Sequence, residues 1–454
     1  MQKEFSNNFN SPILKFEGML KTNQVYFFDV QEFENIIHYY IDSGEINLAN
    51  KALELAIHQH PYNTELTLLK TELLIFDGNL DEAFDILDSF QELEPNNQEI
   101  YIQKATIYSK KNKHTEAIKY LEQSLIFCDE PLDIWSLLGI EYMMLDDYVN
   151  AKKYFEYHID NDIEDHQALY NILYCYDQLK EYKNSIILLN SILEVNPYNE
   201  IAWFELGKQY LNIENKEEAL SSFDFAIISE EHFVGAYIEK GKVLEILGKI
   251  DEAIKNYKIA LQLEDASSYL YYKIGLCYEK IKNNKAAVKY FKNAINLDPS
   301  NINAWNGIID FYINLNNYKK AIYYLEKILK IDENNIGNWE KIGTLYKKNR
   351  FYSNAEKAFE KAISLGSLNY QTWIDSIDSL LFLNQWNRAQ QVAKKAKKNF
   401  PSDYLIDYRL AGCYLKIGKT FEAQYYIDNF KNNNLQVPIS IKYLFPEFSS
   451  IMNR

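Results

Sequence analysis

The sequence predicts an all-α protein in which short helical hairpins follow one another along the chain. The first observation is a period of 34 residues that recurs without a gap from Val30 to Val437 in a chain of 454 residues. The second is the stretch Ser268 to Asn301, where two helical patterns are separated by a polar turn and closed by Asp298 and Pro299. Small and large residues share the helical faces of that stretch, as close packing of one helix on another requires. Because each repeat buries its face on its neighbours, the length does not imply several globular domains.

Residues 1–29 precede the repeats and are expected to form a leader that caps the first repeat. They begin with a polar stretch and continue with a mixed segment from Ile13 to Asp29. They lack the continuous apolar stretch of a signal peptide, and the chain contains no apolar run of about 18 residues. We therefore expect a soluble, cytoplasmic protein with no membrane partner.

Twelve repeats fit the 34-residue frame without an insertion, and we number them 1 to 12. They start at Val30, Thr64, Gln98, Leu132, His166, Glu200, Val234, Ser268, Ile302, Ile336, Tyr370 and Tyr404. Position 20 is alanine in eleven repeats and Ser185 in the fifth, and position 11 is tyrosine in nine repeats and leucine in three. We expect the first helix of each repeat at positions 2 to about 15 and the second at about 18 to 31.

The pattern resembles the tetratricopeptide repeat (TPR), whose signature is W-x2-L-G-x2-Y, then A-x3-F, then P in a helix-turn-helix unit. Repeat 6 carries it as Trp203, Leu206, Gly207, Tyr210, Ala219 and Phe223, and repeat 10 as Trp339, Ile342, Gly343, Tyr346, Ala355 and Phe359. The closing proline is present as Pro61, Pro95, Pro197, Pro299 and Pro401. The whole chain also looks like bacterial proteins made only of TPR units. The resemblance implies an all-α, right-handed TPR superhelix (an α-solenoid) that acts as a protein-binding scaffold.

Residues 438–454 follow the last repeat and contain a short apolar segment between Pro438 and Pro446. The last repeat of a solenoid has an apolar face that no further repeat covers. We therefore expect this segment to be a C-terminal cap.

No residue pattern predicts catalysis, a cofactor or a metal site. His58 and His60 are two residues apart, whereas two metal ligands on one helix need a spacing of three or four. The stretch Gly412 to Thr420 is similar to a phosphate-binding P-loop, but it has one residue too many between its glycines and joins two helices. The four cysteines do not form a disulfide framework, and we expect them to be reduced packing residues. The sequence therefore predicts a protein that is not an enzyme.

Positions 2, 5, 9 and 12 of the first helix form a stripe that lines the concave groove in TPR proteins, and we call it the groove stripe. Its positions 5 and 9 in repeats 5 to 8 supply the predicted contact residues Tyr170, Tyr174, Phe204, Lys208, Ile238, Lys242 and Tyr272. Aromatic rings supply contact area, and lysines attract or orient carboxylates. We therefore predict that the groove binds an extended peptide or helix of a partner protein. Position 5 is never lysine, which excludes the carboxylate clamp of chaperone-binding TPR domains. The alternative explanation of the aromatic residues on the stripe is compositional bias, since the chain has 37 tyrosines.

The net charge of −16 is distributed unevenly. Residues 1–250 hold 19 Lys and Arg against 44 Asp and Glu (−25), and residues 251–454 hold 29 against 20 (+9). One alternative function is therefore an RNA- or ribosome-associated factor that uses the Lys-rich C-terminal half, including Lys394, Lys395, Lys397 and Lys398. Nucleic acid is not the expected partner, because the chain has only four arginines, the residue best suited to phosphate. Another alternative is head-to-tail self-association of the acidic front with the basic back.

Overall fold

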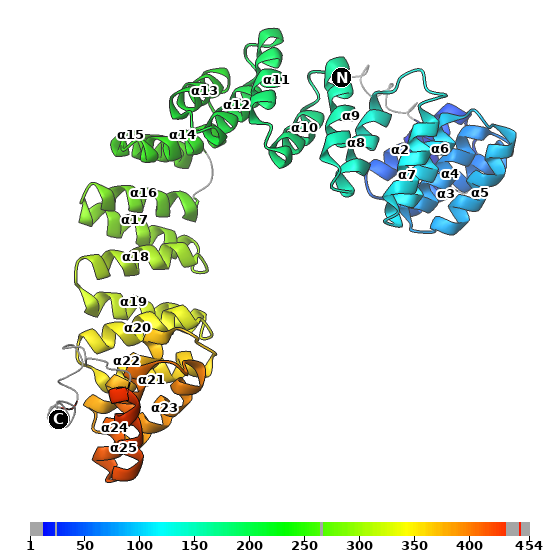
Figure 1. Ribbon diagram of the computed structural model, residues 1–454. Helices are drawn as coiled ribbons and strands as arrows, with labels where there is room; N and C mark the ends of the chain where they lie inside the picture. The colour runs from blue at the N-terminus through cyan, green and yellow to red at the C-terminus, as the bar shows by residue number, and fades with distance from the viewer. Residues whose placement is uncertain (1–11, 23–24, 264–266, 433–444, 446–454) are drawn as a thin grey trace. The chain divides into compact units, whose positions relative to one another are not determined.

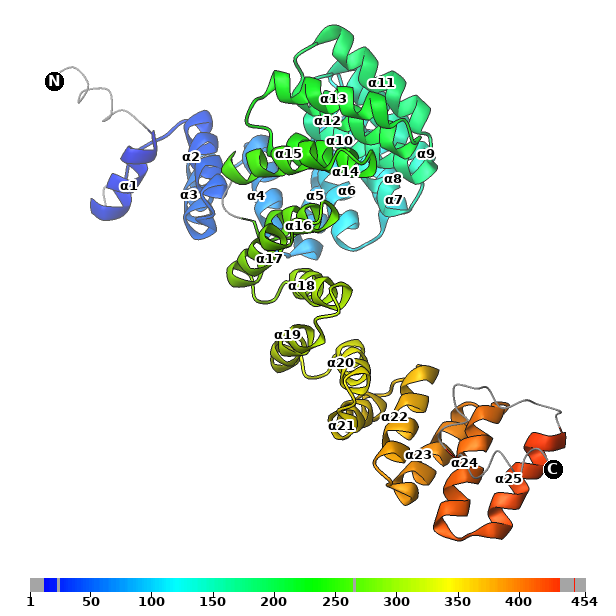
Figure 2. The ribbon, with the colours of Figure 1, turned by 90° about the vertical axis from the view of Figure 1, so that its left-hand side faces the viewer.

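The computed structural model describes residues 12–22, 25–263, 267–432 and 445. Within these ranges every regular element is an α-helix, from α1 to α25 (Figure 1). The chain divides into two compact parts, residues 1–215 and 216–454, which we call the N-terminal part and the C-terminal part. In each part successive helices pack on one another, so the predicted all-α solenoid architecture is confirmed (Figure 2). Most of the C-terminal segment 438–454 and residues 1–11 of the leader lie outside the described residues.

The N-terminal part contains α1 to α12. Their bounds are α1 Pro12–Thr22, α2 Val30–Asp42, α3 Ile46–Gln59, α4 Thr64–Phe76, α5 Leu80–Leu93, α6 Gln98–Lys110, α7 His114–Ser124, α8 Leu132–Met144, α9 Tyr148–Asn161, α10 His166–Leu179, α11 Tyr182–Val195 and α12 Glu200–Asn212. In the leader, the buried Phe16 ring of α1 lies 5.9 Å from the ring of Tyr40 in α2.

The C-terminal part contains α13 to α25. Their bounds are α13 Lys216–Ser229, α14 Val234–Ile246, α15 Ile250–Leu263, α16 Ser268–Lys280, α17 Asn284–Leu297, α18 Ile302–Asn314, α19 Tyr318–Ile331, α20 Ile336–Lys348, α21 Tyr352–Ser364, α22 Tyr370–Phe382, α23 Trp386–Asn399, α24 Tyr404–Ile417 and α25 Thr420–Asn432. From α2 onward the helices begin at positions 1 and 17 of the 34-residue frame, one residue earlier than expected. We propose these twelve helix pairs as the repeats.

The small residue at position 20 is fully buried in every repeat, from Ala49 in the first to Ala423 in the last, with 0% exposure. Ser185, the one exception to alanine, is equally buried, and its hydroxyl donates to the Tyr182 carbonyl 2.8 Å away. A small side chain here lets neighbouring helices approach closely, because a larger one would hold their backbones apart.

A second packing rule links positions 8 and 24 of the same repeat. A Cβ built on Gly139, Gly241, Gly275 or Gly343 would lie 2.5 to 2.7 Å from the aromatic ring at position 24. All five repeats with glycine at position 8 have Phe or Tyr at position 24, and the other seven have Leu, Ile or Ala there. The two positions thus share one volume, as expected in a close-packed interior.

Polar contacts fix the turns and the junctions between repeats. Position 15 has a positive φ, between 54° and 84°, in all twelve repeats, although only four of these residues are glycine. At position 34, Asn or Asp side chains such as Asn301 accept a backbone N–H of the next helix and cap it. The indole of Trp305 at position 4 donates to the Pro299 carbonyl at position 32 of the preceding repeat, 2.8 Å away. The same contact recurs at Trp339, which donates to the Glu333 carbonyl.

Candidate partner-binding surfaces

Tyr170 and Tyr174 lie one turn apart on α10, in the N-terminal part, and form an exposed aromatic pair. Their side chains are 43% and 46% exposed, and the i,i+4 spacing places them on one face of the helix. The Tyr174 ring packs edge-on against Tyr148, with ring centroids 5.9 Å apart. Two adjacent exposed rings are a surface that a partner can cover.

Phe204 and Lys208 lie on α12, also in the N-terminal part, and are close to Tyr170. The Lys208 Nζ lies 5.5 Å from the centre of the Phe204 ring and 2.8 Å from Glu205 Oε2. Burial raises the pKa of Tyr170, Glu205 raises it further and Lys208 lowers it, so both charges lie near its hydroxyl. The fold therefore brings Tyr170, Phe204 and Lys208 to one surface.

The other three predicted contact residues belong to the C-terminal part: Ile238 and Lys242 lie on α14, and Tyr272 lies on α16. All three are only half-exposed. The Tyr272 ring lies 6.3 Å from Phe291, a core residue, so part of its surface is already used in packing. Burial disfavours the charge on Lys242, but the hydrogen bond to Glu239, the charge of Glu239 and the nearby Tyr269 hydroxyl together outweigh burial and raise the pKa of the lysine.

Both lysines among the seven predicted contact residues form ion pairs with glutamates of the same chain. Lys208 lies 2.8 Å from Glu205, and Lys242 Nζ lies 2.6 Å from Glu239 Oε1. The sequence interpretation gave these lysines the task of attracting a partner's carboxylates and did not consider such pairing. The i,i+3 spacing of Glu205 with Lys208 and of Glu239 with Lys242 is the signal that was missed.

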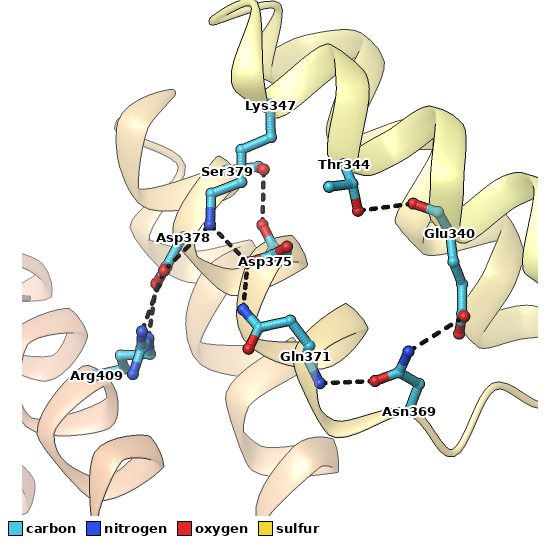
Figure 3. A network of polar contacts seen from close by, with 9 residues as sticks. All are labelled: Glu340, Thr344, Lys347, Asn369, Gln371, Asp375, Asp378, Ser379 and Arg409. Carbon is cyan, nitrogen blue, oxygen red and sulfur yellow. Dashed lines mark hydrogen bonds and ion pairs between the residues drawn. The ribbon is translucent and has the colours of Figure 1, made fainter. Parts of the chain in front are cut away.

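In repeats 10 to 12, polar side chains of the groove stripe are engaged in hydrogen bonds and ion pairs within the chain (Figure 3). Asp378, at position 9 of repeat 11, accepts from the Nε and Nη2 atoms of Arg409 at 2.6 and 3.1 Å, and Arg409 is only 2% exposed. The Lys347 ammonium group lies 2.6 Å from Asp375, which also accepts from Gln371 at 2.7 Å. Buried charges of this kind need their partners, since an unpaired one is strongly destabilising.

Phe445 covers the groove stripe of repeat 12. Its ring lies 6.0 Å from the ring of Tyr408 and 6.2 Å from that of Trp386, and a Cβ on Gly412 would clash with it. Tyr408 and Gly412 occupy positions 5 and 9 of the repeat, the same positions as Tyr170 and Tyr174 in repeat 5. The chain therefore places its own aromatic side chain on the stripe of the last repeat, a contact that spacing along the sequence does not reveal.

One cluster has the residue types of a catalytic triad. His158 Nδ1 lies 2.8 Å from Ser136 Oγ, and Nε2 lies 2.9 Å from Asp165 Oδ2. The Leu132 carbonyl oxygen is also 3.0 Å from Nδ1. A carbonyl can only accept, so an Nδ1–H that donates to it cannot take the Ser136 proton. We assign the cluster a structural role, because it joins the start of α8, the end of α9 and the cap of α10.

The described residues hold no group of three or more His, Cys, Asp or Glu placed to bind a metal ion. Cys175, Cys277 and Cys413 are buried and free, and burial raises the pKa of each thiol to about 12, so none is a reactive thiolate at neutral pH. No helix in the described ranges is long and apolar enough to cross a bilayer.

The lysine cluster on α23 is partly engaged inside the protein. Lys397 donates to Asp407 Oδ2 at 2.7 Å and to the Asp403 carbonyl at 2.9 Å. The Lys394 ammonium group lies 5.5 Å from the centre of the Tyr414 ring. Two of the four lysines are thus committed to internal contacts, which leaves a smaller surface for phosphate than the sequence indicates.

Three family models match the chain, and each is described as a tetratricopeptide repeat. One covers residues 282–342, the second 98–125, 166–199 and 336–365, and the third 238–302. No curated protein matches the chain by sequence.

Several solved structures resemble parts of the chain. The C-terminal part of a TPR repeat-containing protein from Cytophaga hutchinsonii is 17% identical, with a TM-score of 0.44, over 53% of this chain and 98% of that chain. YrrB, described as a TPR protein with an unusual peptide-binding site, is 20% identical, with a TM-score of 0.33, over 39% of this chain and 92% of its own. The structure of Naa15/Naa10 bound to HypK-THB is 14% identical, with a TM-score of 0.38, over 87% of this chain and 67% of that chain.

Proposed function

Because the chain is a tetratricopeptide repeat protein, a fold that serves protein–protein interaction, we propose that it is a non-catalytic scaffold. It holds an extended segment or a helix of a partner protein on its groove stripe. The observation that carries this proposal is the exposed pair Tyr170 and Tyr174 on α10, with Phe204 and Lys208 nearby on α12.

The chemistry of this surface favours an apolar or aromatic segment over an acidic one. A fully covered tyrosine buries about 150 to 250 Å² and contributes a hydroxyl that fixes orientation. Lys208 is neutralised by Glu205, so it adds cation–π contact to Phe204 more than it adds net charge. Ile238, Lys242 and Tyr272 in the C-terminal part are proposed as a second, smaller contact group, since they are less exposed.

The test is a peptide array, followed by affinity measurement on the peptides that bind the intact protein. Tyr174→Ala combined with Phe204→Ala is expected to raise the Kd at least tenfold, about 1.4 kcal/mol or more, because aromatic anchors dominate such interfaces. The matched control is Tyr62→Ala with Tyr198→Ala, two tyrosines that are 101% and 74% exposed but lie in loops between helices. Unchanged affinity in the first variant, with helix content preserved, means that the stripe is not the binding surface.

The RNA-binding alternative stays a prediction that salt dependence tests. Binding through phosphates weakens steeply as salt rises, whereas an aromatic surface loses little affinity. Self-association of acidic front and basic back is tested by light scattering at low and high salt, since attraction between exposed charges is screened by salt.

A further inference from the structure

A pocket of about 750 Å³ opens among α19, α20 and α21, which lie side by side in the C-terminal part (Figures 1 and 2). Its residues on α20 are Trp339, Ile342 and Tyr346, at positions 4, 7 and 11 of repeat 10. The groove stripe uses positions 2, 5, 9 and 12, so the pocket is a different surface from the proposed peptide groove. Its size falls within the range of about 300 to 1,000 Å³ typical of ligand sites.

The floor of the pocket is aromatic and held rigidly. Trp339 donates its indole N–H to the Glu333 carbonyl at 2.8 Å, and the Tyr346 hydroxyl donates to Glu326 Oε1 at 2.6 Å. Burial, together with that hydrogen bond, raises the pKa of Tyr346 to about 12, so the hydroxyl stays protonated. Tyr323 adds a third ring from α19. Fixed rings of this kind accept an aromatic side chain edge-on or in offset stacking.

Each wall of the pocket carries two lysines, Lys327 and Lys330 on α19 and Lys357 and Lys361 on α21. In the part of the chain that the structure describes, none of the four ammonium groups has a hydrogen bond or an ion pair, and only that of Lys327 has a cation–π contact, with Tyr323 at 4.7 Å. The lining contains two glutamates, so its net charge is +2, and Glu326 already accepts from Tyr346. Like charges on facing walls repel one another, and an anionic occupant relieves that repulsion.

The four lysines occur together at one junction between repeats only. They stand at positions 26 and 29 of repeat 9 and at positions 22 and 26 of repeat 10. At the other ten junctions the same four positions never hold more than two lysines. Compositional bias toward lysine acts on all repeats alike, so it does not account for this concentration above an aromatic floor.

We infer that this pocket binds an acidic peptide segment in which carboxylates flank one aromatic side chain. The ring enters between Trp339, Tyr346 and Tyr323, and the flanking carboxylates meet the lysines of the two walls. The aromatic insertion gives affinity, and the charges give orientation and a fast encounter. The inference is independent of the proposed groove, because it uses other helices and a partner of opposite character.

The probe is an N-acetylated Glu-Glu-Phe-Glu-Glu peptide, titrated by calorimetry into the full-length protein. We expect binding that weakens at least tenfold in Lys327→Glu with Lys330→Glu, and that is lost when phenylalanine in the probe is replaced by alanine. The matched control is Lys395→Glu with Lys398→Glu, which changes the same positions 26 and 29 of repeat 11. This control is expected to keep the wild-type affinity.

Two results overturn the inference. Equal weakening in the control variant means that the probe responds to general positive charge and not to the pocket. Tighter binding of ATP than of the peptide, lost in Lys357→Glu with Lys361→Glu, means that the pocket takes a small anionic ring compound instead. Circular dichroism of each variant confirms that helix content is intact, which is expected because all four lysines are exposed.

Discussion

The pairing of glycine at position 8 with an aromatic ring at position 24 predicts a rescue experiment at Gly275 and Phe291. In Gly275→Ala the new Cβ lies 2.7 Å from two atoms of the Phe291 ring. The ring has little room to move, because it is fully buried and the backbone of Gly307 also lies close to it, where a Cβ would be 2.8 Å from the ring. Overpacking lowers the free energy of unfolding by up to about 3 kcal/mol, and the better helix propensity of alanine raises it by about 1 kcal/mol. We expect Gly275→Ala to lose about 2 kcal/mol of unfolding free energy.

Phe291→Leu alone leaves a cavity and is expected to lose about 1 to 2 kcal/mol, less than the 3 to 5 kcal/mol typical of Phe→Ala. The double variant reproduces the Ala105 and Leu121 pair that repeat 3 already carries. It is expected to lose only about 1 kcal/mol, which is a coupling of about 2 to 3 kcal/mol between the two sites. Urea unfolding followed by circular dichroism measures the cycle, and hydrogen exchange of α16 and α17 localises it. The control Gly337→Ala, with only Asn335 Oδ1 at 3.5 Å, is expected to lose no stability and to gain up to about 1 kcal/mol from the helix propensity of alanine. Additive losses in the double variant would refute the shared-volume rule.

Three further outcomes are expected. Ala287→Leu, at a position 20 with no exposed surface, loses about 1 to 3 kcal/mol in urea unfolding by overpacking, and a smaller loss would show that the neighbouring helix can shift. Burial disfavours the Glu245 carboxylate, but hydrogen bonds from Lys273, Lys280 and Tyr257, together with the charge of Lys273, lower its pKa below 4.5. Its contribution to stability is therefore present above about pH 4.5 and is lost as the pH falls through the lowered value, so Glu245→Gln makes the acid limb of a stability–pH curve shallower. Gly248→Ala, at φ +76°, loses about 1 to 2 kcal/mol, and thermal melting at the wild-type temperature would contradict the turn geometry.

Periodic features of the sequence predicted most of the fold. Alanine at position 20 recurs in almost every repeat, so the frame and the helix type followed from spacing alone. The first helices of most repeats begin one residue earlier than expected because Asn or Asp at position 34 of the preceding repeat caps them directly. Local capping decides the exact residue at which a helix begins, so helix ends are the part of the fold that a sequence predicts least well.

The candidate sites were less predictable because they depend on side chains that break the repeat. The i,i+3 spacing of Glu205 and Lys208 was enough to predict their ion pair. The contact of Asp378 with Arg409 was not predictable in this way, because it joins different repeats. Phe445 reaches Gly412 through a segment that lies outside the repeat frame. The pocket beside α20 depends on four lysines from two adjacent repeats, which only the packing of the helices brings together. The role of all seven predicted stripe residues stays a prediction.

The left-handed turn residue at position 15 carries a conformational cost that differs from repeat to repeat. Repeats 1, 2, 7 and 12 place glycine there, as Gly44, Gly78, Gly248 and Gly418, and the other eight hold residues such as Lys180 and Arg350 in a conformation that costs roughly 1 kcal/mol. Nearest-neighbour coupling transmits each such cost only to adjacent repeats. Repeats 1, 2, 7 and 12 thus have relaxed turns, whereas repeats 3 to 6 and 8 to 11 carry the conformational cost in their turns. Arg350→Gly would remove such a cost from the turn between α20 and α21, two of the helices that line the lysine pocket.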